Sequence, residues 1–255
     1  RMLACSMCGR YSLATPADQL AKHFQLTTSP PLSPRYNIAP SQPIAIVRIG
    51  KWGQTRLKPN SPPTNISTDR LIESDPIFWE WAPVRWGLIP SWAKYPAIGN
   101  KMINARAETV AEKPAFREAF ARSRCLVPAD GYYEWQREGR MGQRKQPFYI
   151  RLRDGRPFAF AGLWERWVEP DGAIVESCAI LTTEPNESLK DIHERMPVIL
   201  AQADYDQWLD PAVRQAQLLQ PLLRPYPPED MIACAVSLRV NDPQNDDAGC
   251  IEPLA

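Results

Sequence analysis

The sequence predicts an α+β fold with a largely antiparallel sheet. Short runs rich in β-branched and aromatic residues, which are typical of strands, outnumber the helical segments. Strands and helices do not alternate regularly, which argues against a parallel α/β sheet. The 27 prolines are spread along the chain and indicate long irregular connections around one core. Closure of the sheet into a barrel fits this pattern but does not follow from it.

Two helices and three strands are predicted in the first half of the chain. The first helix spans residues 16–25, because Pro16 suits a first helical position, Thr15 can cap the helix and Asp18 completes a variant of the capping box. Apolar residues at helical spacing predict a second helix at 114–122. Strands are expected at 44–49, 125–127 and 132–135, and a long polar surface loop at 58–75.

The clearest pairing signal in the second half is a hairpin over residues 147–167. Two aromatic-rich runs flank Asp154-Gly155, a dipeptide that is typical of tight turns. Neither an internal repeat nor a linker is evident, so we expect one domain. Further strands are expected at 177–183, 198–201 and 231–240, and helices at 203–209 and 211–219.

Composition and charge exclude few classes of function. No apolar run approaches the roughly 18 residues that a membrane span needs. Residues 1–7 are too short for a secretory signal. The formal net charge of +1 neither indicates nor excludes nucleic acid, because a groove can be locally basic. We expect a cytoplasmic, nucleoid-associated protein, or a nuclear one in a eukaryote.

The six cysteines do not form a CxxC pair, so zinc and redox motifs have no support and no cofactor is expected. Cys125, Cys178 and Cys234 lie in apolar runs and are expected to be buried thiols.

Three polar or aromatic stretches are candidates for chemistry. His193 lies among charged residues before a predicted strand, where an imidazole suits proton transfer near neutral pH, although a structural role is slightly favoured for it alone. Residues 104–109 form either a pocket wall in which Arg106 grips an anion, or a solvated loop or helix start with a local ion pair. The rings of residues 86–92 either pack in the core or stack on unpaired bases, at about 1–3 kcal/mol per base.

Glu134 has two equally plausible environments. On a strand it shares a face with Tyr132, and burial beside rings would raise its pKa and suit it to act as a general acid. On an edge strand it would instead face outward into solvent.

Six short motifs lie at residues 7–11, 35–40, 86–90, 103–109, 129–135 and 191–197. Together, and in this order, they resemble the SRAP (SOS-response-associated peptidase) family of abasic-site processing proteins. The resemblance implies a single α+β domain with a mostly antiparallel, β-barrel-like core and flanking helices. That domain would span residues 7–225, with 1–6 upstream of it and 226–255 as its C-terminal strand and tail.

The same resemblance implies a mature chain that begins at Cys8 and binds single-stranded DNA containing abasic sites. Cys8 is then the nucleophile, and Asn104, Glu134 and His193 complete the active site. We expect a monomer without membrane association, and the sequence names no replication-fork partner. The positions that match the family's DNA groove are Arg10, Asn37, Pro40, Trp86, Arg106, Trp135, Thr182 and Arg195.

An N-terminal cysteine suits this chemistry because it offers two nucleophiles to one aldehyde. Its α-amine, with an ordinary pKa of about 7.7–8.0, can form a Schiff base with the open-chain sugar. Its thiol can then close a five-membered thiazolidine in an intramolecular step. The adduct would shield the lesion, and the same Schiff base can lead to weak β-lyase activity.

Two other functions fit the residues. A cysteine peptidase would use Cys8 and His193 as a dyad, with Glu134 or Asn104 in support, and would cleave itself at the Met7–Cys8 bond. A non-catalytic reader of modified DNA would bind equally well without Cys8. Adduct formation on aldehyde-bearing DNA favours the first function, and turnover of unrelated peptides favours the peptidase.

Overall fold

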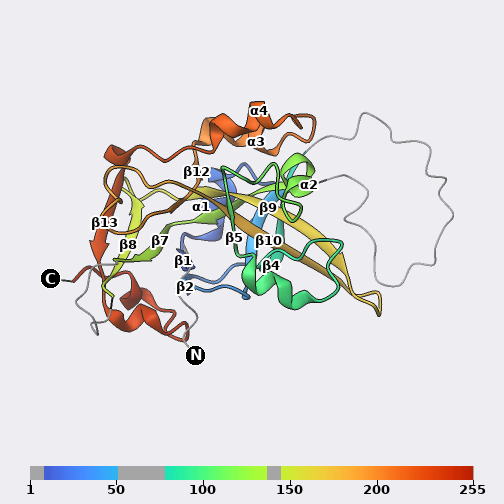
Figure 1. Cartoon of the computed structure of the whole chain (residues 1–255). Coiled ribbons are helices and arrows are strands. Elements are labelled where there is room, and N and C mark those ends of the chain that lie inside the picture. Colours follow the sequence, from blue (N-terminus) through green and yellow to red (C-terminus); the bar gives the residue numbers. More distant parts are fainter. Residues whose placement is uncertain (1–8, 51–77, 137–144, 255) are drawn as a thin grey trace, which may run out of the picture.

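Five strands close into a barrel in the structure, a computed structural model that describes residues 9–50, 78–136 and 145–254 (Figure 1). They are β3 (Pro43–Gly50), β4 (Phe78–Trp86), β6 (Arg124–Ala129), β9 (Phe158–Val168) and β10 (Ile174–Thr183). The strands pair in the order β10–β4–β3–β6–β9, and β9 pairs back onto β10. Every pairing in this ring is antiparallel except that of β4 with β10. The predicted fold class and barrel-like core are confirmed.

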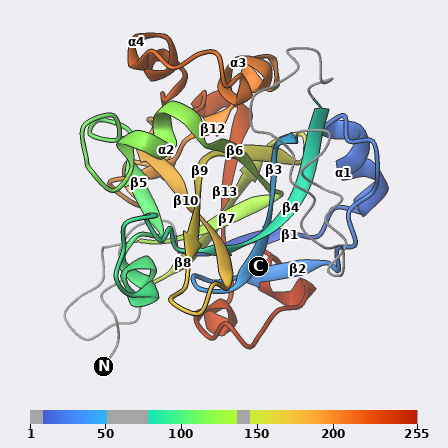
Figure 2. The ribbon, with the colours of Figure 1, turned by 90° about the vertical axis from the view of Figure 1, so that its right-hand side faces the viewer.

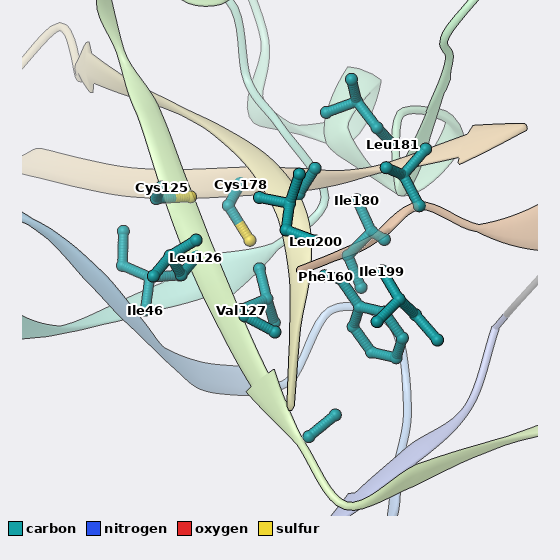
Figure 3. Close-up of a cluster of buried hydrophobic side chains, with 14 of the residues drawn as sticks. Ile46, Cys125, Leu126, Val127, Phe160, Cys178, Ile180, Leu181, Ile199 and Leu200 are labelled. Carbon is teal, nitrogen blue, oxygen red and sulfur yellow. The ribbon is translucent and has the colours of Figure 1, made fainter. Parts of the chain in front are cut away.

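Side chains on both faces of the barrel strands are buried. Leu126 and Val127 are neighbours on β6 and therefore point to opposite faces, yet neither is exposed. Both pack in one apolar cluster with Phe160, Ile180 and Ile199 (Figure 3). A strand that is buried on both faces needs an unbroken apolar run, which is why residues 125–127 are recognisable as a strand in the sequence.

A second sheet contains the N-terminal strand. Its strands are β1 (Tyr11–Leu13), β2 (Arg35–Ile38), β7 (Gly131–Trp135), β8 (Pro147–Leu152) and β13 (Met231–Ala235). Their order across the sheet is β13–β8–β7–β1–β2, with every neighbour antiparallel. Asp130 links β6 to β7, so the chain passes directly from the barrel into this sheet. The Asp130 carboxylate accepts hydrogen bonds from the backbone nitrogens of Ala14 and Thr15 at 2.5 and 2.9 Å, which fixes the end of β1 at the same corner.

Short helices and short strands complete the fold (Figure 2). In that view α2, α3 and α4 lie at the top, and α1 lies to one side of β3 and β4. The helices are α1 (Ala17–His23), α2 (Arg117–Arg122), α3 (Tyr205–Leu209) and α4 (Ala216–Leu219). The remaining strands are β5 (Asn104–Arg106) and β11 (Met196–Pro197), which pair with β10, and β12 (Ile199–Leu200), which pairs with β9.

Short 3₁₀ helices connect several of these elements. They lie at Pro96–Lys101, Gln202–Asp204, Gln220–Leu222, Pro228–Asp230, Leu238–Asn241 and Ala248–Cys250. None of the helices in the described part of the chain combines the length and the hydropathy of a membrane span.

The hairpin predicted over residues 147–167 is wrong. A turn does form there, with Gly155 at a φ of +74° and its nitrogen bonded to the Leu152 carbonyl at 3.2 Å. However, β8 pairs with β7 and β13, whereas β9 pairs with β6, β10 and β12. The turn therefore carries the chain from one sheet to the other. The true hairpin joins β9 to β10, with Gly172 at a φ of +90° in its turn.

Local predictions near both ends of the chain also need correction. Thr15 does not cap α1, because its hydroxyl donates to Asp130 at 2.6 Å and the N-cap position is Pro16. The strand predicted at 231–240 ends at Ala235, and the chain then turns into a 3₁₀ segment whose cap, Ser237, accepts from the nitrogen of Arg239.

Other elements differ in length or were missed. The helix predicted at 211–219 covers only Ala216–Leu219, and β1, β2 and β4 were not predicted. The polar loop predicted at 58–75 lies outside the described residues.

Candidate active site

A buried acid and a buried imidazole face each other beside β7, the central strand of the second sheet. Glu134 lies on β7, and His193 lies in the connection between β10 and β11. Glu134 Oε2 and His193 Nε2 are 3.8 Å apart, and their side chains are only 2% and 6% exposed. This separation is too long for a strong hydrogen bond but short enough for the charge of either group to act on the other.

Glu134 is buried, and its strand is not an edge strand. Because β7 lies between β1 and β8, both of its edges are paired. The alternative of an outward-facing glutamate on an edge strand is therefore wrong.

The loop that carries His193 fixes the orientation of the imidazole ring. Nδ1 lies 3.2 Å from both the backbone nitrogen and the carbonyl oxygen of Arg195. The backbone nitrogen of His193 donates to the Leu189 carbonyl at 3.0 Å. These contacts hold Nδ1 against the loop, so Nε2 is the nitrogen that faces Glu134.

Arg195 clamps the same loop onto the neighbouring strands. Its guanidinium donates to both carboxylate oxygens of Glu108, at 2.6 and 2.9 Å, and to the Thr182 carbonyl at 2.5 Å. Partial burial works to raise the pKa of Glu108, but the hydrogen bonds from Arg195 hold that pKa below its ordinary value. The ion pair that the sequence suggested within residues 104–109 is thus made to Arg195, a residue far away in the chain.

Asn104 and Arg106 lie on the short strand β5. This strand pairs in parallel with β10, so that Asn104 is opposite Ile180 and Arg106 is opposite Thr182. Ala105 between them is buried, whereas Asn104 is half-buried and Arg106 is exposed. Side chains alternate along a strand, so Asn104 and Arg106 share the more open face. The expectation of a loop or helix start at this motif is wrong.

Arg10 and Asn37 hold the C-terminal segment. The Arg10 guanidinium donates to Asn37 Oδ1 at 2.9 Å and to the Val240 carbonyl at 2.8 Å. The Asn37 amide donates to the carbonyls of Val240, Asp242 and Asn245, and its side chain is fully buried. Both side chains therefore have structural partners in this structure.

The remaining predicted groove residues divide into buried and accessible positions. Trp86 is 1% exposed, and its indole donates to the Ile103 carbonyl at 2.9 Å. Thr182 is fully buried. Like Asn37, these two offer no side chain to the surface, so their part in a DNA groove stays a prediction without support from the geometry. Pro40 and Trp135 are half-exposed.

The sequence left open whether the rings of residues 86–92 are buried or exposed, and it gave no indication that Tyr95 and two lysines extend an open aromatic surface after β4. Trp92 and Tyr95 are 59% and 73% exposed. With Lys94 and Lys101 they line a hollow of about 540 Å³. The sequence signal was present in the rings of residues 86–92, but burial of Trp86 and exposure of Trp92 could not be told apart without the fold.

Cys8 lies outside the described residues. The described residues also hold no cluster of three or more metal-binding side chains.

Comparison with known proteins gives consistent matches along nearly the whole chain. The family model described as "SOS response associated peptidase (SRAP)" matches residues 7–243. A Bacillus subtilis protein named "Abasic site processing protein YoaM" is 43% identical over 250 residues, covering 96% of this chain and 98% of that protein. "Abasic site processing protein YedK" of Escherichia coli is 27% identical, covering 97% and 100%. A crystal structure of a Bacteroides thetaiotaomicron protein matches with a TM-score of 0.75 at 27% identity, covering 97% and 100%.

Proposed function

The chain belongs to the SOS response associated peptidase (SRAP) family, and from that premise we propose that it captures abasic sites in single-stranded DNA covalently through Cys8. The names of its Bacillus subtilis and Escherichia coli relatives supply the substrate class, since both are called abasic site processing proteins. The geometry around Glu134 and His193 supports the choice of residues.

The observation that carries the proposal is the direction of β1. Tyr11 pairs with Tyr132, and Ser12 pairs with Gly131. The backbone nitrogen of Tyr133 donates to the Arg10 carbonyl at 3.0 Å. When β1 is followed toward the N-terminus, each residue pairs with one further along β7, in the direction of Glu134. The side chain of Glu134 faces His193. The proposal therefore places Cys8 beside the buried carboxyl group of Glu134 and the buried imidazole of His193.

The proposed reaction is a condensation that releases one water. The aldehyde of the open-chain sugar condenses with the α-amine of Cys8 to an imine. The thiol of the same residue then adds to the imine carbon, its proton passes to the imine nitrogen, and a thiazolidine forms. One C–N and one C–S bond replace the two bonds from carbon to oxygen, so neither an oxidant nor a reductant is needed. Because one residue holds both groups, ring closure is intramolecular.

Glu134 and His193 divide the proton transfers in this proposal. Glu134 acts as the general acid and base in opening the sugar ring and in expelling water from the carbinolamine. His193, oriented by the Arg195 backbone, protonates or stabilises the sugar oxygen and assists reversal of the link. Asn104 orients the amine or the aldehyde from β5.

The exposed residues supply non-covalent binding in this proposal. Arg106 shares the open face of β5 with Asn104 and contacts a phosphate, which gives register without sequence preference. Trp92 and Tyr95 offer ring faces for stacking with unpaired bases, and Lys94 and Lys101 beside them attract the backbone.

The test uses protein whose first residue is Cys8, incubated with single-stranded DNA that carries one abasic site. Wild type should give a denaturation-stable adduct, with a mass increase equal to the DNA minus one water. Cys8→Ala should give no adduct and keep its affinity for the strand. Cys234→Ala, which changes a partly exposed cysteine elsewhere, should react as wild type does. An undiminished adduct in Cys8→Ala would remove Cys8 from the mechanism.

A self-processing peptidase step is a second candidate, favoured by the family description and by the Glu134–His193 pair. Its test is intact-mass analysis of purified protein that retains residues before Cys8. Slow cleavage at Met7–Cys8 that disappears in His193→Ala supports self-processing, whereas a stable chain assigns removal to a separate peptidase.

A further inference from the structure

Residues 237–250, near the C-terminal end of the described chain, form a segment that we name the C-terminal strap. It packs on the second sheet through an apolar cluster distinct from the main core. The cluster brings Val240 and Cys250 of the strap against Tyr133 of β7 and Tyr149 of β8. Tyr133 is the residue before Glu134, so the strap lies against the strand that carries the proposed acid.

Asp246 is the main polar anchor of the strap. Its Oδ1 accepts from the backbone nitrogens of Tyr36 and Asn37 at 2.5 and 2.8 Å, and its Oδ2 accepts from Arg35 Nε. Partial burial works to raise the pKa of Asp246, but these hydrogen bonds hold that pKa below its ordinary value. One carboxylate thus fixes the position of β2 relative to the strap.

Asn37 connects the anchored strap to Arg10, at the start of β1. Its amide nitrogen donates to three strap carbonyls, and its oxygen accepts from Arg10. Arg10 also donates to the strap carbonyls of Val240 and Asn241, at 2.8 and 3.3 Å. Arg10 has the first described side chain after Cys8, the proposed nucleophile. It is therefore held both by Asn37 and by the strap.

The strap also reaches the far end of β7. Asn241 Oδ1 accepts from the indole nitrogen of Trp135 at 2.7 Å, and Trp135 directly follows Glu134. Tyr133 donates its hydroxyl to the Tyr36 carbonyl at 2.6 Å, which links β7 to β2. The strap consequently connects the residues flanking the proposed acid to the residues that follow the proposed nucleophile.

We propose that Asp246 is a positioning residue, which acts through Asn37 and Arg10 to set where the N-terminal nucleophile lies relative to Glu134. This inference rests on the function proposed above. Asp246 lies beyond residue 243, where the match to the family model ends. In a reaction that depends on proximity, a displacement of about 1 Å can slow the chemical step about a hundredfold.

The test compares two aldehydes in Asp246→Ala, in Asp246→Asn and in a matched control. Asp154→Ala is the control, because Asp154 likewise accepts from a backbone nitrogen and from an arginine Nε, in a turn remote in sequence from the strap. The first aldehyde is an abasic site in single-stranded DNA at saturating concentration, and the second is free glyoxylate. Thermal unfolding and the affinity for intact single-stranded DNA are measured alongside.

Asp246→Ala should slow crosslinking to abasic DNA about tenfold or more while its reaction with glyoxylate stays at the wild-type rate. A freely diffusing aldehyde needs no alignment with Glu134, so only the DNA reaction depends on positioning. Asp246→Asn keeps an oxygen for the amides of Tyr36 and Asn37. It should therefore crosslink at a rate between those of wild type and Asp246→Ala. In a variant that already carries Asn37→Ala, the Asp246 substitution should slow crosslinking little further, because both residues act through the same chain of contacts.

Several outcomes overturn this inference. Wild-type crosslinking rates in both Asp246 variants would refute it, as would an equal loss with both aldehydes, which indicates a general structural role. If Asp246→Ala does not fold, Asp246→Asn carries the same comparison. Absence of an adduct in wild type would instead remove the proposed function, and this inference with it.

Discussion

Replacement of Arg124 by methionine should destabilise the protein more than the same replacement at the exposed Arg122, which lies on the neighbouring helix α2. Arg124 is the first residue of β6 and is buried, with only 4% of its surface exposed. Its guanidinium makes five hydrogen bonds to backbone carbonyls of α2 and of the segment from Trp208 to Val213, at 2.5–3.0 Å. Burial lowers the pKa of this guanidinium to about 10, so the group is still charged at neutral pH.

The magnitude follows from what methionine leaves behind. Each hydrogen bond from a charged donor contributes about 1.5–3 kcal/mol, but desolvation of the cation offsets much of this gain. Methionine fills the aliphatic volume but leaves the carbonyls without their donor, and a buried acceptor left unsatisfied costs about 1–3 kcal/mol. Because several carbonyls lose their donor together, we expect a net loss of about 3–5 kcal/mol. For a chain of this size the loss corresponds to a fall in Tm on the order of 10 °C.

Urea and thermal unfolding followed by circular dichroism measure the effect. Arg122→Met is the matched control, because Arg122 is 60% exposed and its ion pair with Glu118 lies on the surface; such a pair contributes less than about 1 kcal/mol. If Arg124→Met loses no more stability than Arg122→Met, the carbonyl contacts do not hold α2 and α3 on the barrel.

Two further predictions concern the open side of the site. Trp92→Ala should weaken binding of single-stranded DNA by about 1–3 kcal/mol per stacked base and leave the crosslinking rate at saturating DNA unchanged. Fluorescence anisotropy measures this, with Val168→Ala as a control at another exposed apolar residue; equal affinities would exclude stacking on Trp92. The Glu108–Arg195 pair should stabilise the fold at neutral pH and lose that effect in acid. Because the pKa of Glu108 is lowered from 4.5, the stability difference between wild type and Glu108→Gln should be present above that pH and vanish as pH falls through the lowered pKa. The difference should stay below about 1 kcal/mol, since Glu108 is half-exposed, and a difference that grows in acid would contradict the assignment.

Local sequence signals predicted strands well where both faces are buried. Residues 125–127 form an unbroken apolar run, and they lie in β6 at the centre of the barrel. The strand β4 was missed, because Glu80, Pro83 and Arg85 interrupt its apolar pattern. Pro83 has no N–H to donate, and it is tolerated because β10 pairs with β4 only at Arg85 and Trp86. Arg85 is only half-buried.

Pairing partners were harder to predict than strands. Asp154-Gly155 indicated a turn, and a turn is present. Turn chemistry fixes the local backbone but does not decide which strands the two arms join. Here β8 is paired on both edges by β7 and β13, strands that are distant in the sequence from the turn, so the arms separate into different sheets.

The candidate residues of the site could be named from sequence motifs, but their partners could not. Glu134 and His193 are distant in the chain, and only the fold brings Oε2 and Nε2 within 3.8 Å. The interior positions of Asn37 and Thr182 were also hidden, because polar residues are expected at the surface unless their hydrogen-bond partners are known.

The site depends on both ends of the described chain. Arg10, at the start of β1, is held by carbonyls of Val240 and Asn241, and the strap that supplies them is fixed by Asp246 to β2. Contacts between residues this far apart in the sequence are costly in loop-closure entropy, so we expect them in the folded chain and not in the unfolded one. A nucleophile at the N-terminus, as proposed, would therefore meet Glu134 only in the completed fold. A reactive amine and thiol on an unfolded chain would react with aldehydes indiscriminately, whereas the alignment that we propose for β1 and the strap would confine the fast reaction to a sugar that is already bound.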